Sequence, residues 1–427
     1  MSESRDAELY DEAAPPVLRS NSGLRVLWAS RTISVFGDSL SLVTLLLYIA
    51  GTSDQAFAVA ALLLVGDFAP SLLGPLTGVI SDRFDLRRIM VVCELIQAGA
   101  VVVILLALPP LAVLLALVAL RATAGHIFQP ASRAAVPLLV ADRQLESANS
   151  AIGFGSNGME AMGPLAAAAL LPLLGVRGVL LIDVATFLVS ALLLGRLPQL
   201  PAVETAADRP AVLADAVAGV RYLLTTPLIR ELVLGFTAVV AFNGVDDVAL
   251  VFLARDSLHA RGSAVALLYG GVGLGLLAGY ALLGRRAQHV SLVTLALAGF
   301  ALSSLGNLLT GLAWAIAVAF AVQLIRGIGL SAIDVGVNTF LQRQAPAGML
   351  GRAFGSLYGG IGVAAATSYL LGALLLDLTD PRTTFIVAGS GGLMATAATA
   401  AAVSRARRRS DDRPRHDDQP SSEPPTV

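Results

Sequence analysis

The stretch Gly78-Val79-Ile80-Ser81-Asp82-Arg83-Phe84-Asp85-Leu86-Arg87-Arg88 decides how this sequence is interpreted. It lies between apolar runs at about residues 56–78 and 88–108, and each run is long enough to cross a bilayer as a helix. The small Gly78 allows two helices to approach closely. Asp82 is an anion placed to meet a helix N-terminus or an arginine across the bundle. A simple positive-inside anchor would need the arginines but neither Gly78 nor Asp82.

The composition excludes the main soluble classes. Of the 427 residues, 56% are apolar and 14% are charged, whereas ordinary soluble proteins are roughly one-quarter charged. The apolar content is sufficient for about a dozen membrane-spanning helices. We therefore exclude a soluble enzyme, a disordered scaffold and a nucleic-acid-binding protein, and we expect an all-α integral membrane protein.

The residue types that are absent or rare narrow the chemistry further. The sequence contains no lysine, so all 29 basic residues are arginine and a phosphate-binding loop of the G-x-x-x-x-G-K-[ST] type is excluded. Cys93 is the single cysteine, which excludes an intramolecular disulfide and a multi-cysteine metal site. We expect no metal, no cofactor and no enzymatic activity. The acidic N-terminus is unlike a signal peptide, so the first apolar run should stay attached.

The apolar runs form two groups of six, which predicts twelve transmembrane helices. The runs fall at about 24–49, 56–78, 88–108, 110–131, 146–173 and 177–196, and then at 229–254, 263–283, 290–310, 312–335, 353–376 and 383–403. An offset of 205 relates the groups and carries Arg121 onto Arg326 and Asp38 onto Asn243, which indicates a duplicated six-helix unit rather than chance spacing. The expected organisation is a disordered tail (1–22), an N-terminal bundle (23–197), a cytoplasmic linker (198–227), a C-terminal bundle (228–404), and a basic, then disordered tail (405–427).

The arginines predict the orientation. With the N-terminus inside, the cytoplasmic loops hold Arg83, Arg87, Arg88, Arg133, Arg143, Arg196, Arg209, Arg221, Arg230, Arg285, Arg286, Arg343 and Arg352. The outer loops hold only Arg177, Arg255, Arg261 and Arg382. This asymmetry follows the positive-inside rule and places both termini in the cytoplasm.

The stretch at 78–88 resembles the G-x-x-x-D-R-x-x-R-R signature of the major facilitator superfamily, at the loop where that family carries it. The resemblance implies the major facilitator fold and a gating loop formed by Gly78, Asp82, Arg83, Arg87 and Arg88. It also implies that Asp82 meets the start of the eleventh helix, near Gly351 to Gly355. The repeat-related loop keeps only Gly284-Arg285-Arg286, so the second half lacks a complete copy of the signature.

Three further strings are similar to family motifs. Leu120-Arg121-Ala122-Thr123-Ala124-Gly125 resembles the fourth-helix element associated with proton coupling, and Gly163-Pro164 resembles part of the fifth-helix motif of antiporters. Met159 and the alanines after Pro164 stand where the complete antiporter motif has glycines. The segments before the fifth and eleventh helices, at 142–149 and 342–352, resemble the branch of macrolide-efflux and siderophore-export proteins.

The string Gly153-Phe154-Gly155-Ser156-Asn157-Gly158 fits a dinucleotide-binding pattern, but no strand precedes it and a membrane helix follows. We therefore interpret its glycines as helix-packing or helix-bending positions.

Charged residues at membrane depth indicate the functional site, because each needs a partner or a wet cavity. The proton-coupling candidates are Asp38, Arg121 and Glu160, and the cavity candidates are Asp67, Asp246, Asp247, Arg326 and Asn338. An inert buried Asp38–Arg121 pair is the alternative. We interpret His126 as a packed histidine. Four charges near predicted helix ends are expected to snorkel to the interface, namely Arg31, Glu94, Asp183 and Asp334.

The sequence therefore predicts a secondary transporter in the bacterial plasma membrane, and the family resemblance implies that it exports a hydrophobic small molecule, such as a drug, antibiotic or siderophore. The resemblance implies alternating access with proton antiport, a monomer, and protons, substrate and bilayer as partners. A nutrient importer or uniporter is the alternative within the same class. A polytopic membrane transferase would need a metal-binding or nucleophilic cluster, which Asp246-Asp247 alone does not supply. A non-transporting scaffold predicts no charges at mid-membrane.

Overall fold

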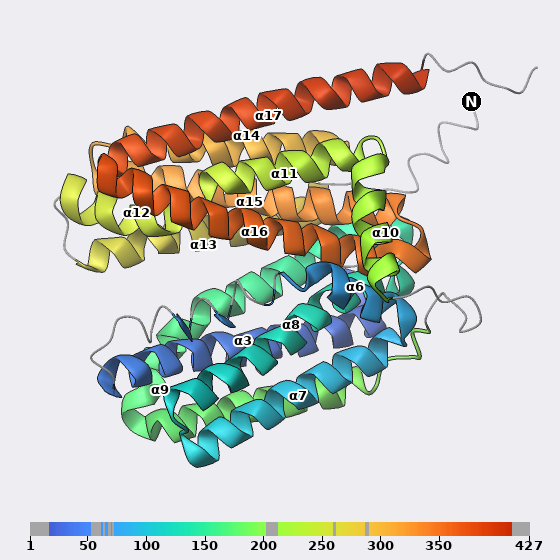
Figure 1. The fold of residues 1–427 in the computed structure, drawn as a ribbon, viewed down its shortest axis with the longest axis vertical. Coiled ribbons are helices and arrows are strands. Elements are labelled where there is room, and N and C mark those ends of the chain that lie inside the picture. Colours follow the sequence, from blue (N-terminus) through green and yellow to red (C-terminus); the bar gives the residue numbers. More distant parts are fainter. Residues whose placement is uncertain are drawn as a thin grey trace, which may run out of the picture.

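The computed structural model is all-helical and describes residues 17–52, 61–62, 65–66, 70, 72–201, 212–258, 262–286 and 290–411. The N-terminal bundle contains α2 (Val17–Ser20), α3 (Ser22–Thr52), α6 (Gly74–Arg83), α7 (Leu86–Ala107), α8 (Leu111–Leu139) and α9 (Leu145–Leu194). After α10 (Val212–Thr225), the C-terminal bundle contains α11 (Ile229–Asn243), α12 (Asp246–Phe252), α13 (Gly262–Arg286), α14 (Leu292–Gly311), α15 (Ile316–Gln344), α16 (Leu350–Leu378) and α17 (Pro381–Asp411). Figure 1 shows the two bundles side by side, with α10 crossing them at one end.

Several helix boundaries have clear local causes. Asp85 caps α7 by accepting a hydrogen bond from the Arg88 amide, and Pro109 and Pro110 separate α7 from α8. The runs expected at 146–173 and 177–196 both lie in α9. The two helical parts of α9 meet at a kink at Gly175, where φ is +63°. Only glycine adopts this conformation without steric cost. The fourth run was expected to end near residue 131, but α8 continues through Pro130 and Pro137 to Leu139.

Eight described helices are long and apolar enough to cross a membrane. The pair 214–225 and 229–243, which is bent by 95°, would make a ninth if counted as one span. Most of the run expected at 56–78 lies outside the described residues.

The hydrophobic core is shared between the bundles at only one end of the described part. There, a single cluster includes Leu24 and Ala134 of the N-terminal bundle together with Phe300, Phe354 and Val403 of the C-terminal bundle. At the other end each bundle has its own cluster, around Phe187 in one and Phe385 in the other. We call the end with the shared core and α10 the linker end (Figure 1).

Candidate functional site

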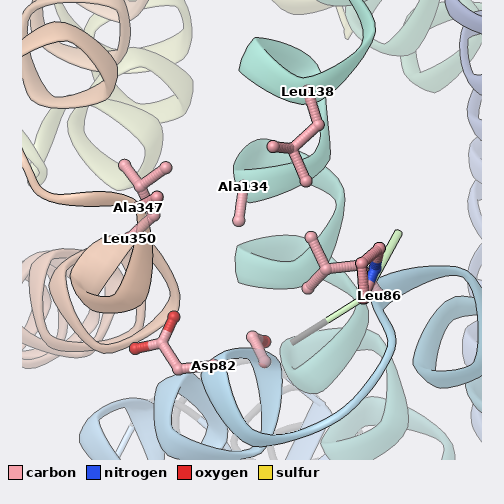
Figure 2. Close-up of a pocket in the computed structure, with 8 residues that line it drawn as sticks. Asp82, Leu86, Ala134, Leu138, Ala347 and Leu350 are labelled. Carbon is pink, nitrogen blue, oxygen red and sulfur yellow. The ribbon is translucent and has the colours of Figure 1, made fainter. Parts of the chain in front are cut away.

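Asp82 joins the two bundles at the linker end. Its carboxylate accepts hydrogen bonds from the backbone amides of Gly351 and Arg352, at 2.6 and 2.9 Å, and from the Arg352 side chain at 2.9 Å. These amides begin α16, so the anion also meets the positive end of that helix dipole. Figure 2 shows the Asp82 carboxylate directed toward the helix that carries Leu350, beside a small pocket of about 20 Å³. The structure thus places Asp82 at the start of α16, as the resemblance implied.

Glycines allow the backbones of α6 and α16 to touch at this contact. A Cβ atom on Gly78 would lie 2.3 Å from the Gly351 carbonyl oxygen, and one on Gly74 would lie 2.4 Å from the Gly355 carbonyl oxygen. Two glycines four residues apart on each helix form the small-residue pattern that favours close membrane-helix packing. The contact is specific to glycine, because any side chain would push the helices apart.

A carboxylate on the linker helix completes this contact. Asp215 of α10 accepts hydrogen bonds from Arg83 of the N-terminal bundle, at 2.5 and 3.0 Å, and from Arg352 of the C-terminal bundle at 3.0 Å. We call Asp82, Arg83, Asp215 and Arg352 the latch. Asp215 could not be predicted from the sequence, since an acidic residue in a polar linker carries no distinctive signal. Of the other gating-loop arginines, Arg87 donates to the Leu197 carbonyl within its own bundle.

A second set of contacts surrounds the latch. Arg343, at the end of α15, contacts Asp142 at 3.0 Å and Glu146 at 2.8 Å in the opposite bundle. Asn149 donates to Gln342 at 2.6 Å and to Thr339 at 3.0 Å. The segments 142–149 and 342–352, which resemble those of macrolide-efflux and siderophore-export proteins, therefore contact each other and hold the linker end closed.

A cluster of charged side chains lies inside the N-terminal bundle around Arg121. Arg121 contacts Asp38 of α3 at 3.2 Å and Asp183 of α9 at 3.3 Å, and it donates to Ser41 at 2.5 Å. Glu94 of α7 accepts a hydrogen bond from Ser34 at 3.1 Å. The Asp183 and Glu94 residues are fully buried, whereas the Asp38 side chain is 37% exposed.

This cluster corrects two expectations. Asp183 and Glu94 do not snorkel, because both project inward from their helices. Asp183 lies within the long α9, and the Asp183 residue has no exposed surface. Glu160 of α9 is exposed and lines the cavity between the bundles, and its backbone carbonyl accepts a hydrogen bond from Ser39, the neighbour of Asp38.

The C-terminal bundle contains a related arginine site. Arg326 forms an ion pair with Asp246 and donates to Gln323 at 3.2 Å. The repeat offset of 205 relates Arg326 to Arg121 and Asp246 to Ser41 rather than to Asp38. Asn243, the counterpart of Asp38, donates to Ser304 at 3.0 Å. Asp67 and the side chain of Asp247 lie outside the described residues.

A cavity of about 380 Å³ lies between the bundles and is lined by residues of α3, α8, α9, α13, α15 and α16. In its wall, Arg133 of α8 forms an ion pair with Asp334 of α15 at 2.9 Å. Asp334 also accepts hydrogen bonds from Tyr280 at 3.1 Å and from Asn338 at 2.6 Å. Arg31 lines the same cavity and donates to Ser132 and Ser156.

The cavity corrects three further expectations. Arg133 was assigned to a cytoplasmic loop, but it lies within α8 and is buried. Asp334 and Arg31 were expected to snorkel, but both are held by polar partners in the wall of the cavity. Asn338 lies beside this wall, because its side chain bonds both Asp334 and Tyr358.

The remaining glycine motifs have packing roles. A Cβ on Gly163 would lie 2.2 Å from the Ser39 hydroxyl, so this residue sets a close contact between α9 and α3, and Pro164 follows it inside α9. In the dinucleotide-like string, Gly153 faces Tyr280 and Gly155 faces Trp28. Within the described ranges, no group of three or more His, Cys, Asp or Glu side chains could hold a metal ion.

Comparison with known proteins agrees with this architecture. A family model of the major facilitator superfamily, described as a transmembrane secretion effector, matches residues 14–424. An uncharacterized MFS-type transporter of Bacillus subtilis, YfiS, is 25% identical over 390 residues, which cover 88% of this chain and 91% of the relative. Macrolide efflux protein A of Streptococcus pyogenes is 28% identical over 124 residues, which cover 28% of this chain and 30% of that protein.

Solved structures share the fold. A bacterial homologue of the iron transporter ferroportin, in an outward-facing state, has a TM-score of 0.75 at 18% identity, covering 90% of this chain and 99% of the other. The human organic anion transporter MFSD10 has a TM-score of 0.74 at 18% identity, covering 90% of this chain and all of the other.

Proposed function

The chain belongs to the transmembrane secretion effector family of major facilitator superfamily transporters, and from this premise we propose that it exports a hydrophobic small molecule by proton antiport. Membership makes it a multi-pass membrane transporter rather than an enzyme. The direction, the coupling ion and the substrate are our proposal. The match to part of macrolide efflux protein A supports export.

The observation that carries proton coupling is the excess of carboxylates around Arg121. Asp38, Asp183 and Glu94 lie with one guanidinium group in the interior of the N-terminal bundle. Three ionised carboxylates near one cation would leave an uncompensated buried charge, which is costly in a low-dielectric environment. Binding a proton relieves that cost. The partly exposed Asp38 gives the cluster a route for proton exchange.

Arg121 supplies the means to release the proton. Arginine stays protonated at any working pH, and a guanidinium group close to a carboxylate favours the ionised form of that acid. Movement of α3 relative to α8 would change the distance from Asp38 to Arg121. The acid would then release its proton when it is close to Arg121 and rebind one when it is not.

The latch supports alternating access, with the linker end as the inner gate. We propose twelve spans, with the linker end and both termini in the cytoplasm. Arg83, Arg343 and Arg352 all lie at the linker end, as the positive-inside rule requires of a cytoplasmic surface. The latch and the shared core join the two bundles at the linker end, which supports a closed state of the proposed inner gate. Export then requires the latch to open so that the substrate can enter from the cytoplasm.

Everted membrane vesicles test this proposal. Respiration acidifies their interior and quenches acridine orange, and we expect at least one of a panel of neutral, cationic and anionic hydrophobic drugs to restore fluorescence as protons leave in exchange for drug. Asp38→Asn should abolish this response while the vesicles still acidify. A matched control is Asp380→Asn, in the exposed loop between α16 and α17, where hydrogen bonds from Thr383 lower the pKa of the carboxyl. Drug uptake without proton movement would indicate a uniporter. Uptake that acidifies the interior further would indicate a symporter. Either result would contradict proton antiport.

A further inference from the structure

Arg133 has unused hydrogen-bonding capacity inside the cavity between the bundles. Its side chain is only 6% exposed, yet its Nε and Nη1 atoms have no hydrogen-bond partner among the described residues. Nη2 donates to Asp334 at 2.9 Å, and the side chain of Tyr358 also interacts with the guanidinium group. A buried donor without a partner is costly, and each free N–H of a guanidinium group can donate a charge-assisted hydrogen bond to a carboxylate oxygen.

The surroundings of Arg133 already accommodate a carboxylate. Asp334 shows the arrangement: its oxygens accept hydrogen bonds from Arg133, from the Tyr280 hydroxyl and from the Asn338 amide. Arg31 adds a second cation to the same cavity wall. These donors come from both bundles, since Arg31 and Arg133 lie in the N-terminal bundle and Tyr280 and Asn338 lie in the C-terminal bundle.

We propose that the transported molecule carries an anionic group, most simply a carboxylate, which accepts a hydrogen bond from the free Nε–H or Nη1–H of Arg133, with Arg31 as a second cationic contact. The inference deepens the proposed transport function and rests on it. It refines the hydrophobic substrate expected from the sequence to an amphipathic anion.

The Arg133–Asp334 pair also links substrate binding to gate opening. The pair connects α8 to α15, so separating the bundles at the linker end must break it. Breaking a buried ion pair leaves two uncompensated charges. A substrate anion that remains bound to Arg133 takes the place of Asp334 as its partner. The charge of Arg133 is then compensated when the ion pair breaks. The bound anion thus lowers the barrier to the movement that carries it.

Direct binding to the full-length protein in nanodiscs tests the proposal without relying on transport. The probes are the carboxylate, carboxamide and ammonium forms of two aromatic carriers, naphthalene and pyrene. We expect the carboxylates to bind best. Arg133→Gln should weaken carboxylate binding by about tenfold or more, the amount expected for one charge-assisted hydrogen bond. Arg382→Gln, which changes an arginine at the opposite end of the molecule, is the control.

Asp334→Asn separates this proposal from a purely structural role of the pair. It removes the internal competitor for Arg133, so carboxylate binding should strengthen, whereas a structural ion pair predicts that both single variants weaken binding. The double variant Arg133→Gln with Asp334→Asn leaves no unpaired charge and should still bind carboxylates weakly. Preference for the ammonium or carboxamide probes, absence of carboxylate binding, or weaker binding in Asp334→Asn would overturn the proposal. If one of these results is found while the vesicle assay still shows proton-coupled drug movement, only the anion site is refuted. The proposed transport function is then unaffected.

Discussion

Removing the charge of Asp82 should open the linker end. Asp82 is buried and accepts three hydrogen bonds from Gly351 and Arg352, and the residue is 5% exposed. Asparagine keeps one oxygen acceptor but loses the negative charge. Its NH2 group would face N–H donors of Gly351 or Arg352, so at least one hydrogen bond would be lost. A hydrogen bond to a charged group contributes about 1.5–3 kcal/mol, so the loss of one shifts the equilibrium toward the open state by about 10- to 150-fold.

Alkylation of a reporter cysteine measures this shift. In a Cys93→Ala background, Ala134→Cys places a thiol in the small pocket beside Asp82, where Ala134 is buried (Figure 2). When the gate opens and closes faster than the reagent reacts, the maleimide reaction rate follows the open population. We expect Asp82→Asn to increase the rate by about 10- to 150-fold, matching the free-energy estimate above.

The neighbouring Asp85 provides a matched control for this experiment. Asp85 also accepts backbone hydrogen bonds, but from Arg88 of the same bundle and from Leu200 at the start of the linker, not from the opposite bundle. Asp85→Asn should therefore leave the alkylation rate at position 134 unchanged. An unchanged rate in Asp82→Asn, with normal folding and insertion, would show that Asp82 does not hold the gate closed. An equal increase in both variants would indicate general loosening of the loop.

Three further predictions concern the gate and the Arg121 cluster. Gly78→Ala should speed alkylation at position 134 at least as much as Asp82→Asn, because the new Cβ would lie 2.3 Å from the Gly351 oxygen; Gly99→Ala, where nothing lies within 4 Å, should not. Arg343→Gln should also speed the same reaction, because it removes the ion pairs with the exposed Asp142 and the buried Glu146; a larger effect than that of Asp82→Asn would make this rim the main latch. Arg121→Lys should keep partial proton movement in the vesicle assay and Arg121→Ala almost none, because lysine retains the charge but not the planar fork; normal movement in the alanine variant would assign Arg121 a structural role.

The sequence was sufficient for the family and for the position of the Asp82 contact. Apolar runs report which segments form membrane helices, and the signature at 78–88 identified the loop that meets α16. The partners of that loop were less accessible. Asp215 lies in a polar linker whose helix α10 crosses both bundles, and no local pattern indicates that a linker carboxylate will contact Arg83 and Arg352.

The predictions from the sequence were wrong where the role of a charged residue was inferred from its depth in the membrane. Distance from a predicted helix end says whether a side chain could reach water, but not which face of the helix carries it. Glu94 and Asp183 lie on buried faces, and Arg133 was placed in a loop because the predicted helix ended too early. Two prolines in α8 favoured that early end, yet the helix continues through both of them.

The difference between the two arginine sites is the reason that we propose proton exchange in the N-terminal half of a duplicated fold. Arg326 forms an ion pair with Asp246. The other side chains described at this site, such as that of Gln323, are uncharged, so the charges of the described residues balance. Arg121 has two acidic contacts, with Glu94 buried nearby, so charge balance there depends on protonation. The arginine is retained at the repeat offset, whereas the acids are not. A balanced pair can remain ionised through a transport cycle and act as a fixed strut, while the acid-rich cluster must gain or lose a proton whenever Asp38 moves relative to Arg121. The proton coupling that we propose therefore rests on the surplus of carboxylates in the N-terminal bundle rather than on the arginine that both halves share.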